Sequence, residues 1–233
     1  MKPILMATLF ILACSQSTAN QATHDFQISS AKVTYLDELD LLVFEQQVEG
    51  VAGRTVPEKI GQMDGAIVQG YVFPTTLAPT DVGFGDVEGI VALAVTAHPD
   101  FDDTPLWDEN NDQNYANDGV VYHSHWVVLN NDNRVPGGLS VKQFDASANA
   151  ILPPTNPGMP MYMDSPGYSI VLQDNTLKVL VPAQRIGHKK SFNFDAVSVL
   201  MKVSKHPDKP LLGVYEVYKI LSSDLSLPYT VTH

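Results

Sequence analysis

The sequence of 233 residues has one cysteine and few basic residues. Cys14 lies close to the N-terminus, so disulfide bonds, thiolate zinc sites and cysteine catalysis are excluded from the chain that follows it. Lys and Arg number 14 against 26 Asp and Glu, which gives a formal net charge of -12. This charge argues against nucleic acid and anionic lipid surfaces as partners and favours cations. A bound metal must therefore use histidine, methionine or oxygen ligands.

The first 22 residues have the order of a bacterial export signal. Lys2 is followed by an apolar run over 4–13, too short to span a bilayer, and then by small polar residues over 15–22. The segment 17–19 suits an ordinary signal peptidase, whereas 11–14 looks like a lipobox in which Cys14 carries lipid. We expect export to the periplasm or, as a lipoprotein, to the outer membrane, with no transmembrane span in the mature protein. Mass spectrometry of the mature N-terminus distinguishes ordinary signal-peptidase cleavage at 17–19 from lipoprotein processing at Cys14.

Residues 23–233 have the length and pattern of a single β-sandwich domain. Ten segments combine branched or aromatic residues with alternation or a short apolar run, namely 33–35, 41–48, 66–73, 89–97, 120–129, 139–144, 168–172, 177–182, 192–203 and 211–220. Turn-forming residues separate them, and no long helix is indicated. We therefore predict an all-β fold, an antiparallel β-sandwich or barrel of about ten strands with few or no helices.

Negative charge is concentrated in one part of the chain. Residues 60–133 contain twelve Asp and Glu but no Lys or Arg. Carboxylates packed this closely repel one another unless water, basic side chains or a cation neutralises them. The stretch therefore predicts either a solvated acidic face, paired with basic residues from 178 onward, or a region that binds a cation.

Within this stretch, residues 108–119 place oxygen side chains at every second position. The candidate calcium ligands are Asp108, Asn110, Asp112, Asn114 and, near the end, Asp118. The segment resembles the start of calcium loops of the EF-hand type and the Asp/Asn-rich loops of extracellular β-proteins. It has Gln113 in place of the usual Gly and Gly119 in place of the bidentate Glu. It predicts a structural calcium ion, with an Asx-turn loop as the alternative.

A His-x-His pair lies on the next predicted strand. Residues two apart on a strand point to the same face, so His123 and His125 present two imidazoles together. Neutral imidazole binds zinc, copper, iron or nickel. We predict a transition-metal site here, with two hydrogen-bonded core histidines as the alternative.

Two families share part of this motif. Cupins also carry His-x-His on a strand, but residues 128–131 hold no Glu ligand, which excludes that family. The run His123 to Trp126 looks like the zinc strand of α-class carbonic anhydrases, although Val127 replaces the Gly that follows there. This resemblance implies a catalytic alternative, in which a zinc-bound water attacks carbon dioxide or an ester.

Further ligands are available elsewhere in the chain. His98 precedes the acids at 100, 102 and 103, and Glu88 alternates with Asp86 on another segment. Met159, Met161 and Met163 alternate in a loop or extended stretch, and thioether with imidazole favours copper, particularly Cu(I). The alternative is that methionine fills gaps in the core, with Met161 as a core residue.

These observations predict an exported metal-binding β-sandwich protein. The His-x-His strand holds copper or zinc for storage, delivery or sensing, and calcium braces the neighbouring loop. One alternative is a metal-dependent hydrolase or lyase that uses a zinc-bound water. Another is a non-catalytic interaction module of the cell envelope.

Overall fold

The computed structural model describes residues 24–104, 106–115, 117–145 and 147–233. The described residues form thirteen strands and four short 3-10 helices, which confirms the all-β prediction. The strands are β1 (Ile28–Leu36), β2 (Leu41–Val48), β3 (Ile67–Pro74), β4 (Ile90–Ala97), β5 (His123–Asn131), β6 (Leu139–Val141), β7 (Met163–Asp164), β8 (Ser169–Gln173), β9 (Thr176–Pro182), β10 (Asn193–Phe194), β11 (Val197–Val203), β12 (Leu212–Ile220) and β13 (Tyr229–Thr230). The 3-10 helices are η1 (Asp37–Leu39), η2 (Pro79–Val82), η3 (Asp118–Val120) and η4 (Ala183–Ile186).

Six strands close into a barrel. Their order is β4-β3-β11-β12-β6-β5, and a pairing between β4 and β5 joins the two ends of the sheet. Each pairing within the barrel is antiparallel. The short strand β7 adds to the outside of this order by pairing with β5.

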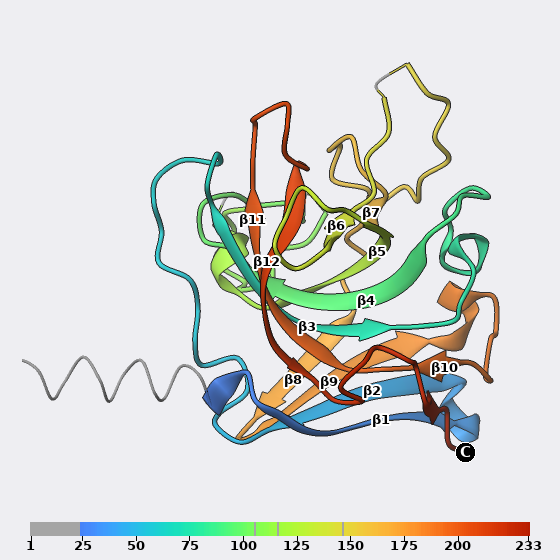
Figure 1. Ribbon diagram of the computed structural model, residues 1–233. Coiled ribbons are helices and arrows are strands. Elements are labelled where there is room, and N and C mark those ends of the chain that lie inside the picture. The colour runs from blue at the N-terminus through green and yellow to red at the C-terminus, as the bar shows by residue number, and fades with distance from the viewer. Residues whose placement is uncertain (1–23, 105, 116, 146) are drawn as a thin grey trace, which may run out of the picture.

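A second sheet lies against one side of the barrel. It has the order β1-β2-β9-β8 and forms the lower layer in Figure 1, below β3 and β4. Strands β10 and β13 make a separate two-stranded pair. The fold therefore combines both predicted architectures, a barrel and a packed second layer.

The strands between these layers are buried on both faces. In β4, Val91, Leu93 and Val95 face the second sheet, whereas Ala92 and Ala94 face the barrel interior. This is why residues 90–97 are apolar almost without interruption instead of alternating with polar residues. The consequence is two separate apolar clusters, one between the layers and one inside the barrel.

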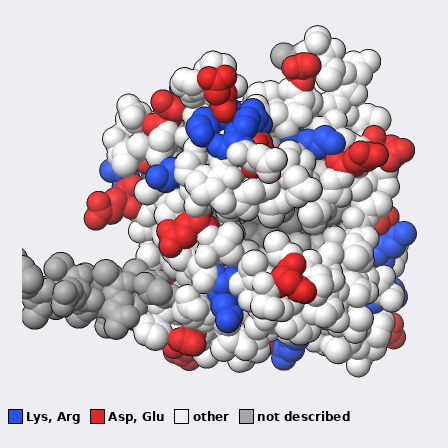
Figure 2. Space-filling model, viewed as in Figure 1, with Lys and Arg blue, Asp and Glu red and all other residues white. Residues whose placement is uncertain are grey.

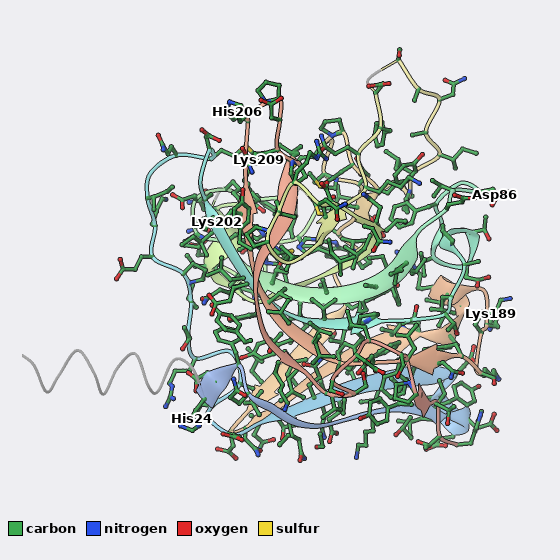
Figure 3. All side chains as sticks on the ribbon, in the orientation of Figure 1. His24, Asp86, Lys189, Lys202, His206 and Lys209 are labelled. Carbon is green, nitrogen blue, oxygen red and sulfur yellow. The ribbon has the colours of Figure 1, made fainter. Side chains whose placement is uncertain are left out.

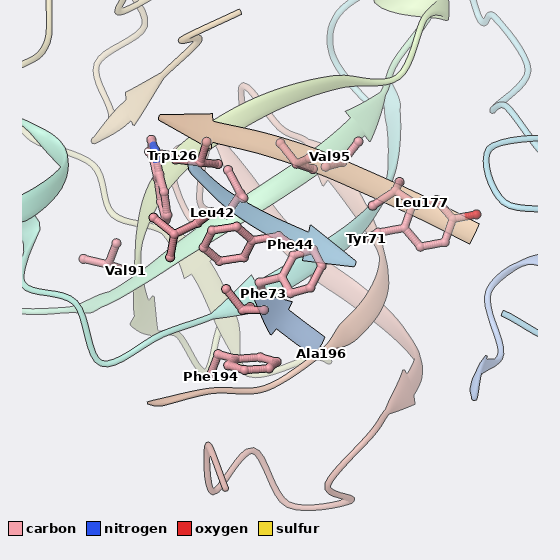
Figure 4. Packing of buried hydrophobic residues seen from close by; sticks show 14 of the residues in the cluster. Leu42, Phe44, Tyr71, Phe73, Val91, Val95, Trp126, Leu177, Phe194 and Ala196 are labelled. Carbon is pink, nitrogen blue, oxygen red and sulfur yellow. The ribbon is translucent and has the colours of Figure 1, made fainter. Parts of the chain in front are cut away.

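Aromatic side chains fill the space between the layers. Phe44 of β2 contacts Phe73 of β3 and Trp126 of β5, with ring centroids 5.3 and 6.2 Å apart, and also stacks near Phe192. Figure 4 shows the rings of Phe44, Phe73 and Trp126 gathered together, with Leu42 beside them. The cluster fixes the second sheet on the barrel, because large buried rings contribute most to the apolar area removed from water.

The predicted strand boundaries differ from the observed ones in a few places. The predicted strand 192–203 is broken at Asp195, whose side chain accepts hydrogen bonds from the backbone of Ala196 and Ser222. The predicted strand 120–129 begins only at His123, because residues 118–120 form η3. The two-residue strands β7 and β13 carry too little pattern to be recognised in a sequence.

Charge on the surface is mixed. On the face shown in Figure 2, basic and acidic side chains are interspersed around an uncharged central area. Among the residues of the acidic stretch, Asp81 pairs with Lys189, at 3.3 Å, and Asp132 pairs with Arg134, at 2.6 Å. No helix in the described part of the chain has the length and hydropathy that a membrane span requires.

The Asp132 carboxylate predicts a pH-dependent part of the stability. It accepts hydrogen bonds from the Arg134 guanidinium and the Ser140 hydroxyl, and Arg134 lowers its pKa below the usual value. A lowered folded-state pKa adds stability that is present above the unfolded pKa of about 3.9 and is lost as pH falls through the folded value. Because Arg134 is half exposed, we expect this part to be about 1 kcal/mol.

Urea unfolding at pH 5 and at pH 2.5 measures this contribution. The Asp132→Asn variant is expected to lose less stability between the two pH values than the wild type does. Asp86→Asn, at an exposed position labelled in Figure 3, is the matched control. Equal pH dependence in the wild type and Asp132→Asn would contradict the assignment.

Candidate metal centre

Four buried side chains meet at one end of the barrel interior. They are His98, Asp103, His123 and His125, each at most 4% exposed. One potential ligand atom from each lies within 4.8 Å of all the others. The Asp103 Oδ1 atom is 3.0 Å from His123 Nε2, 3.3 Å from His98 Nε2 and 3.6 Å from His125 Nε2. A carboxylate oxygen and three imidazole nitrogens thus face a common point, as in a metal-binding site.

The pairing of β4 with β5 brings the three histidines together. In this register Thr96 lies opposite His123 and Ala94 lies opposite His125. His98 follows β4 directly and continues the inward-facing alternation of Ala94 and Thr96. The spacing of two on each strand therefore directs all three imidazoles into the same end of the barrel.

Asp103 reaches the histidines from the long β4–β5 connection. Gly119 holds the far end of this connection against its start, and the His98 N–H donates to the Gly119 carbonyl. A Cβ on Gly119 would lie 2.2 Å from the Phe101 carbonyl oxygen and 2.4 Å from that of His98. Only glycine permits this approach, because a side chain would push the connection away from the strand end.

Hydrogen bonds fix the tautomer of each imidazole. Two Nδ1–H groups donate to backbone carbonyls, that of His98 to Phe101 at 2.9 Å and that of His123 to Val121 at 2.7 Å. The Ser165 hydroxyl donates to the Asp103 carbonyl at 2.6 Å, so its oxygen accepts from His125 Nδ1–H at 3.1 Å. Each neutral ring therefore presents a lone pair on Nε2.

The four converging atoms are all acceptors when the rings are neutral. His98 Nε2 and His123 Nε2 are 2.9 Å apart, and no hydrogen-bond partner for His125 Nε2 lies within the described part of the chain. Two lone pairs at this distance repel each other unless a proton or a cation lies between them. The arrangement is therefore suited to bind a positive ion.

The charges at the centre respond to burial and to one another. Burial lowers the pKa of His125 to about 3, which keeps this imidazole neutral. Burial alone would raise the pKa of Asp103, but the surrounding imidazoles, led by His125 and His98, hold it well below the usual value. Asp103 in turn raises the pKa of His123 against the opposing effect of burial. The raised pKa of His123 favours its protonated form, so a metal ion that binds His123 Nε2 must displace that proton.

Scans against family models, curated proteins and solved structures each found no match.

The structure brings together three of the predicted nitrogen ligands. His98, His123 and His125 all belong to the centre, and Asp103 is one of the acids noted after His98. Glu88 does not belong to it, because it is exposed just before β4, at the opposite end of that strand from His98. Alternation along a strand identified the His-x-His pair, but the choice of Asp103 among neighbouring acids depends on how the connection folds.

The methionine triplet lies in the barrel interior. Met161 and Met163 are buried in the apolar cluster there, and Met159 packs against it. All three line the same cavity as His98 and His125. Core packing accounts for their burial, and a thioether ligand for copper stays a prediction.

The predicted calcium loop forms Asx-turn contacts. Asp108 accepts hydrogen bonds from the backbone N–H groups of Asp112, at 3.2 Å, and Gln113, at 2.8 Å. Asp112 accepts one from the N–H of Asn114, at 2.8 Å, and Asn110 Nδ2 donates to Asp112, at 3.2 Å. These are the contacts expected of the Asx-turn alternative.

One residue of this loop retains features of a cation ligand. Asp118 is fully buried, and neither of its carboxylate oxygens has a hydrogen-bond partner among the residues that the structure describes. Burial raises its pKa, and the neighbouring carboxylates of Asp102 and Asp108 raise it further. In the described residues, however, the loop carboxylates do not gather as closely as the ligand atoms of the histidine centre do. Calcium binding by this loop stays a prediction.

Proposed function

We propose that this protein binds one resident transition-metal ion through Nε2 of His98, His123 and His125 and through Asp103. The observation that carries the proposal is the convergence of three Nε2 lone pairs and a carboxylate oxygen within 4.8 Å. All three tautomers are directed by hydrogen bonds from Nδ1, which is the outer-shell arrangement of metal-bound histidines.

A shared proton is the alternative to a metal ion. One proton joins a single pair of these atoms, such as His123 Nε2 and Asp103 Oδ1. It leaves the buried His125 Nε2 without a partner, which costs free energy. A metal ion accepts lone pairs from all four residues at once, so it satisfies the site more completely.

Burial and rigidity favour a resident ion over one that is delivered elsewhere. The ligands come from a strand, a strand end and a tightly anchored connection, and all are removed from solvent. Copper and zinc are the metals indicated by the sequence, and the donor set also suits iron. Export of the protein remains our proposal from residues 1–22, which lie outside the described residues.

A catalytic role is favoured by one further observation. His98, Asp103 and His125 also line the cavity inside the barrel, so a bound ion would be reached from that cavity. Four protein ligands complete a tetrahedral zinc site, whereas an ion that takes five or six ligands keeps positions for substrate. We therefore propose a metal-dependent enzyme in which the ion acts on a molecule held in the barrel.

Elemental analysis of natively purified protein tests the metal proposal. We expect about one transition-metal ion per chain, as the four-ligand site requires. Replacement by cobalt should give visible absorption bands, and azide should shift them if a coordination position opens to the cavity. A metal-free native protein that also fails to bind added zinc, copper, iron or cobalt would refute the proposal. Cobalt bands unaffected by azide would refute only the open position.

A further inference from the structure

The barrel encloses a cavity of about 150 Å³ that begins at the metal centre. Its lining includes His98 at one end of β4 and Ile90 at the other. At about 3.3 Å per residue of extended strand, about 26 Å of curved backbone separates these two positions. The cavity is therefore elongated, with the candidate ion at one end.

Small inward-facing residues leave this space open. Ala94 and Thr96 of β4 line the cavity, and Gly70 of β3 is paired with Thr96. A Cβ on Gly70 would lie 2.9 Å from the Thr96 side chain, so the glycine makes room for Thr96 itself. Barrels of this strand number are normally filled by bulky side chains, so the short side chains of Ala94 and Thr96 leave part of the interior open to a ligand.

The lining is apolar and carries no cationic side chain. Valine, leucine, isoleucine and methionine side chains make up most of it, and none of the described Lys or Arg residues contributes. The polar side chains are Thr96, His98, Asp103 and His125, all at the metal centre. Thr96 Oγ1, like His125 Nε2, is buried without a hydrogen-bond partner. Such a lining suits a long apolar molecule whose one polar group lies at the end near the metal.

The cavity also has an apolar rim. Ile90 and Val217 line it and are each 37% exposed. Met159, Met161 and Met201 add flexible side chains that adapt to the shape of a ligand. An apolar molecule can therefore pass the rim without crossing a charged barrier.

We propose that the barrel binds an uncharged, chain-like apolar molecule with one oxygen-bearing end, which lies at Thr96 beside the metal centre. The chain-binding part rests on the cavity alone, and the position of the oxygen-bearing end rests on the proposed function. The molecule is the substrate class of the proposed enzyme.

The probes for this proposal are decan-1-ol and the fluorescent apolar dye N-phenyl-1-naphthylamine. We expect the dye to bind the metal-loaded protein saturably, decan-1-ol to displace it, and decane to displace it less well. Val199→Phe fills the cavity wall on β11 and should weaken decan-1-ol binding at least about tenfold while metal content is unchanged. Val171→Phe, at a position 41% exposed on β8, is the matched control.

Two further variants keep the test informative. Val217→Trp narrows the exposed rim and should slow dye binding even if Val199→Phe does not fold. Thr96→Val, of similar shape, should remove the preference for decan-1-ol over decane. Wild-type decan-1-ol binding in both Val199→Phe and Val217→Trp would overturn the proposal. Decan-1-ol binding by a protein that holds no metal and also fails to bind added zinc, copper, iron or cobalt would refute the metal centre but keep the chain site.

Discussion

The variant His123→Ala/His125→Ala is expected to lose its bound metal. Changes to residues that merely support metal ligands weaken binding about 10- to 100-fold, so loss of two direct ligands should leave no stoichiometric ion. Both imidazoles lie at the end of β5 where their replacement leaves the strand pairings intact. Elemental analysis after purification, with circular dichroism to verify the fold, measures the effect.

A matched pair of surface histidines provides the control. His24 and His206 are about half or more exposed and lie on the outside of the molecule in Figure 3. The variant His24→Ala/His206→Ala should retain the wild-type metal content. If the His123→Ala/His125→Ala protein folds and keeps its full metal content, the ion is bound elsewhere and the assignment of this centre is wrong.

The variant Ser165→Ala tests the effect of a residue that orients metal ligands without being a ligand itself. Its hydroxyl joins His125 Nδ1 to the Asp103 carbonyl, so its loss removes a support from two ligands without removing either one. We expect metal affinity to fall about 10- to 100-fold, between the wild type and the double histidine variant. Competition with a chelator measures this intermediate effect.

The variant Phe44→Ala is expected to cost about 3–5 kcal/mol of unfolding free energy. Phe44 is fully buried between the second sheet and the barrel, where it contacts the rings of Phe73, Trp126 and Phe192. Its removal leaves a cavity that these rigid neighbours fill only in part. Urea unfolding followed by tryptophan fluorescence measures the loss, because Trp126 lies in the same cluster.

Leu39→Ala is the control for this change. Leu39 is 63% exposed in η1, so its truncation should change stability by less than about 0.5 kcal/mol. A loss in Phe44→Ala no greater than that in Leu39→Ala would show that the second sheet does not depend on this aromatic cluster for its place on the barrel.

Local pattern was sufficient to predict most strands. The predicted segment 41–48 coincides with β2, and 89–97 differs from β4 by one residue, because branched and aromatic residues in short runs pack well only in extended backbone. The break at Asp195 and the two-residue strands depend on hydrogen bonds to distant segments, such as the pairing of Phe194 with Tyr229. Such contacts leave no periodic signal in the sequence.

The sequence by itself determined that extended backbone directs His123 and His125 to one face, because the side-chain period of a strand is two. It also limited the available donors to histidine, methionine and oxygen, since Cys14 is the only thiol. Closure of the barrel was decided only in the tertiary structure, by the pairing of β4 with β5 that places His98 beside His123. The approach of Asp103 was decided there as well, because the connection between His98 and His123, two residues 25 positions apart, is brought back by contacts at Gly119 and Ser165 rather than by a local pattern.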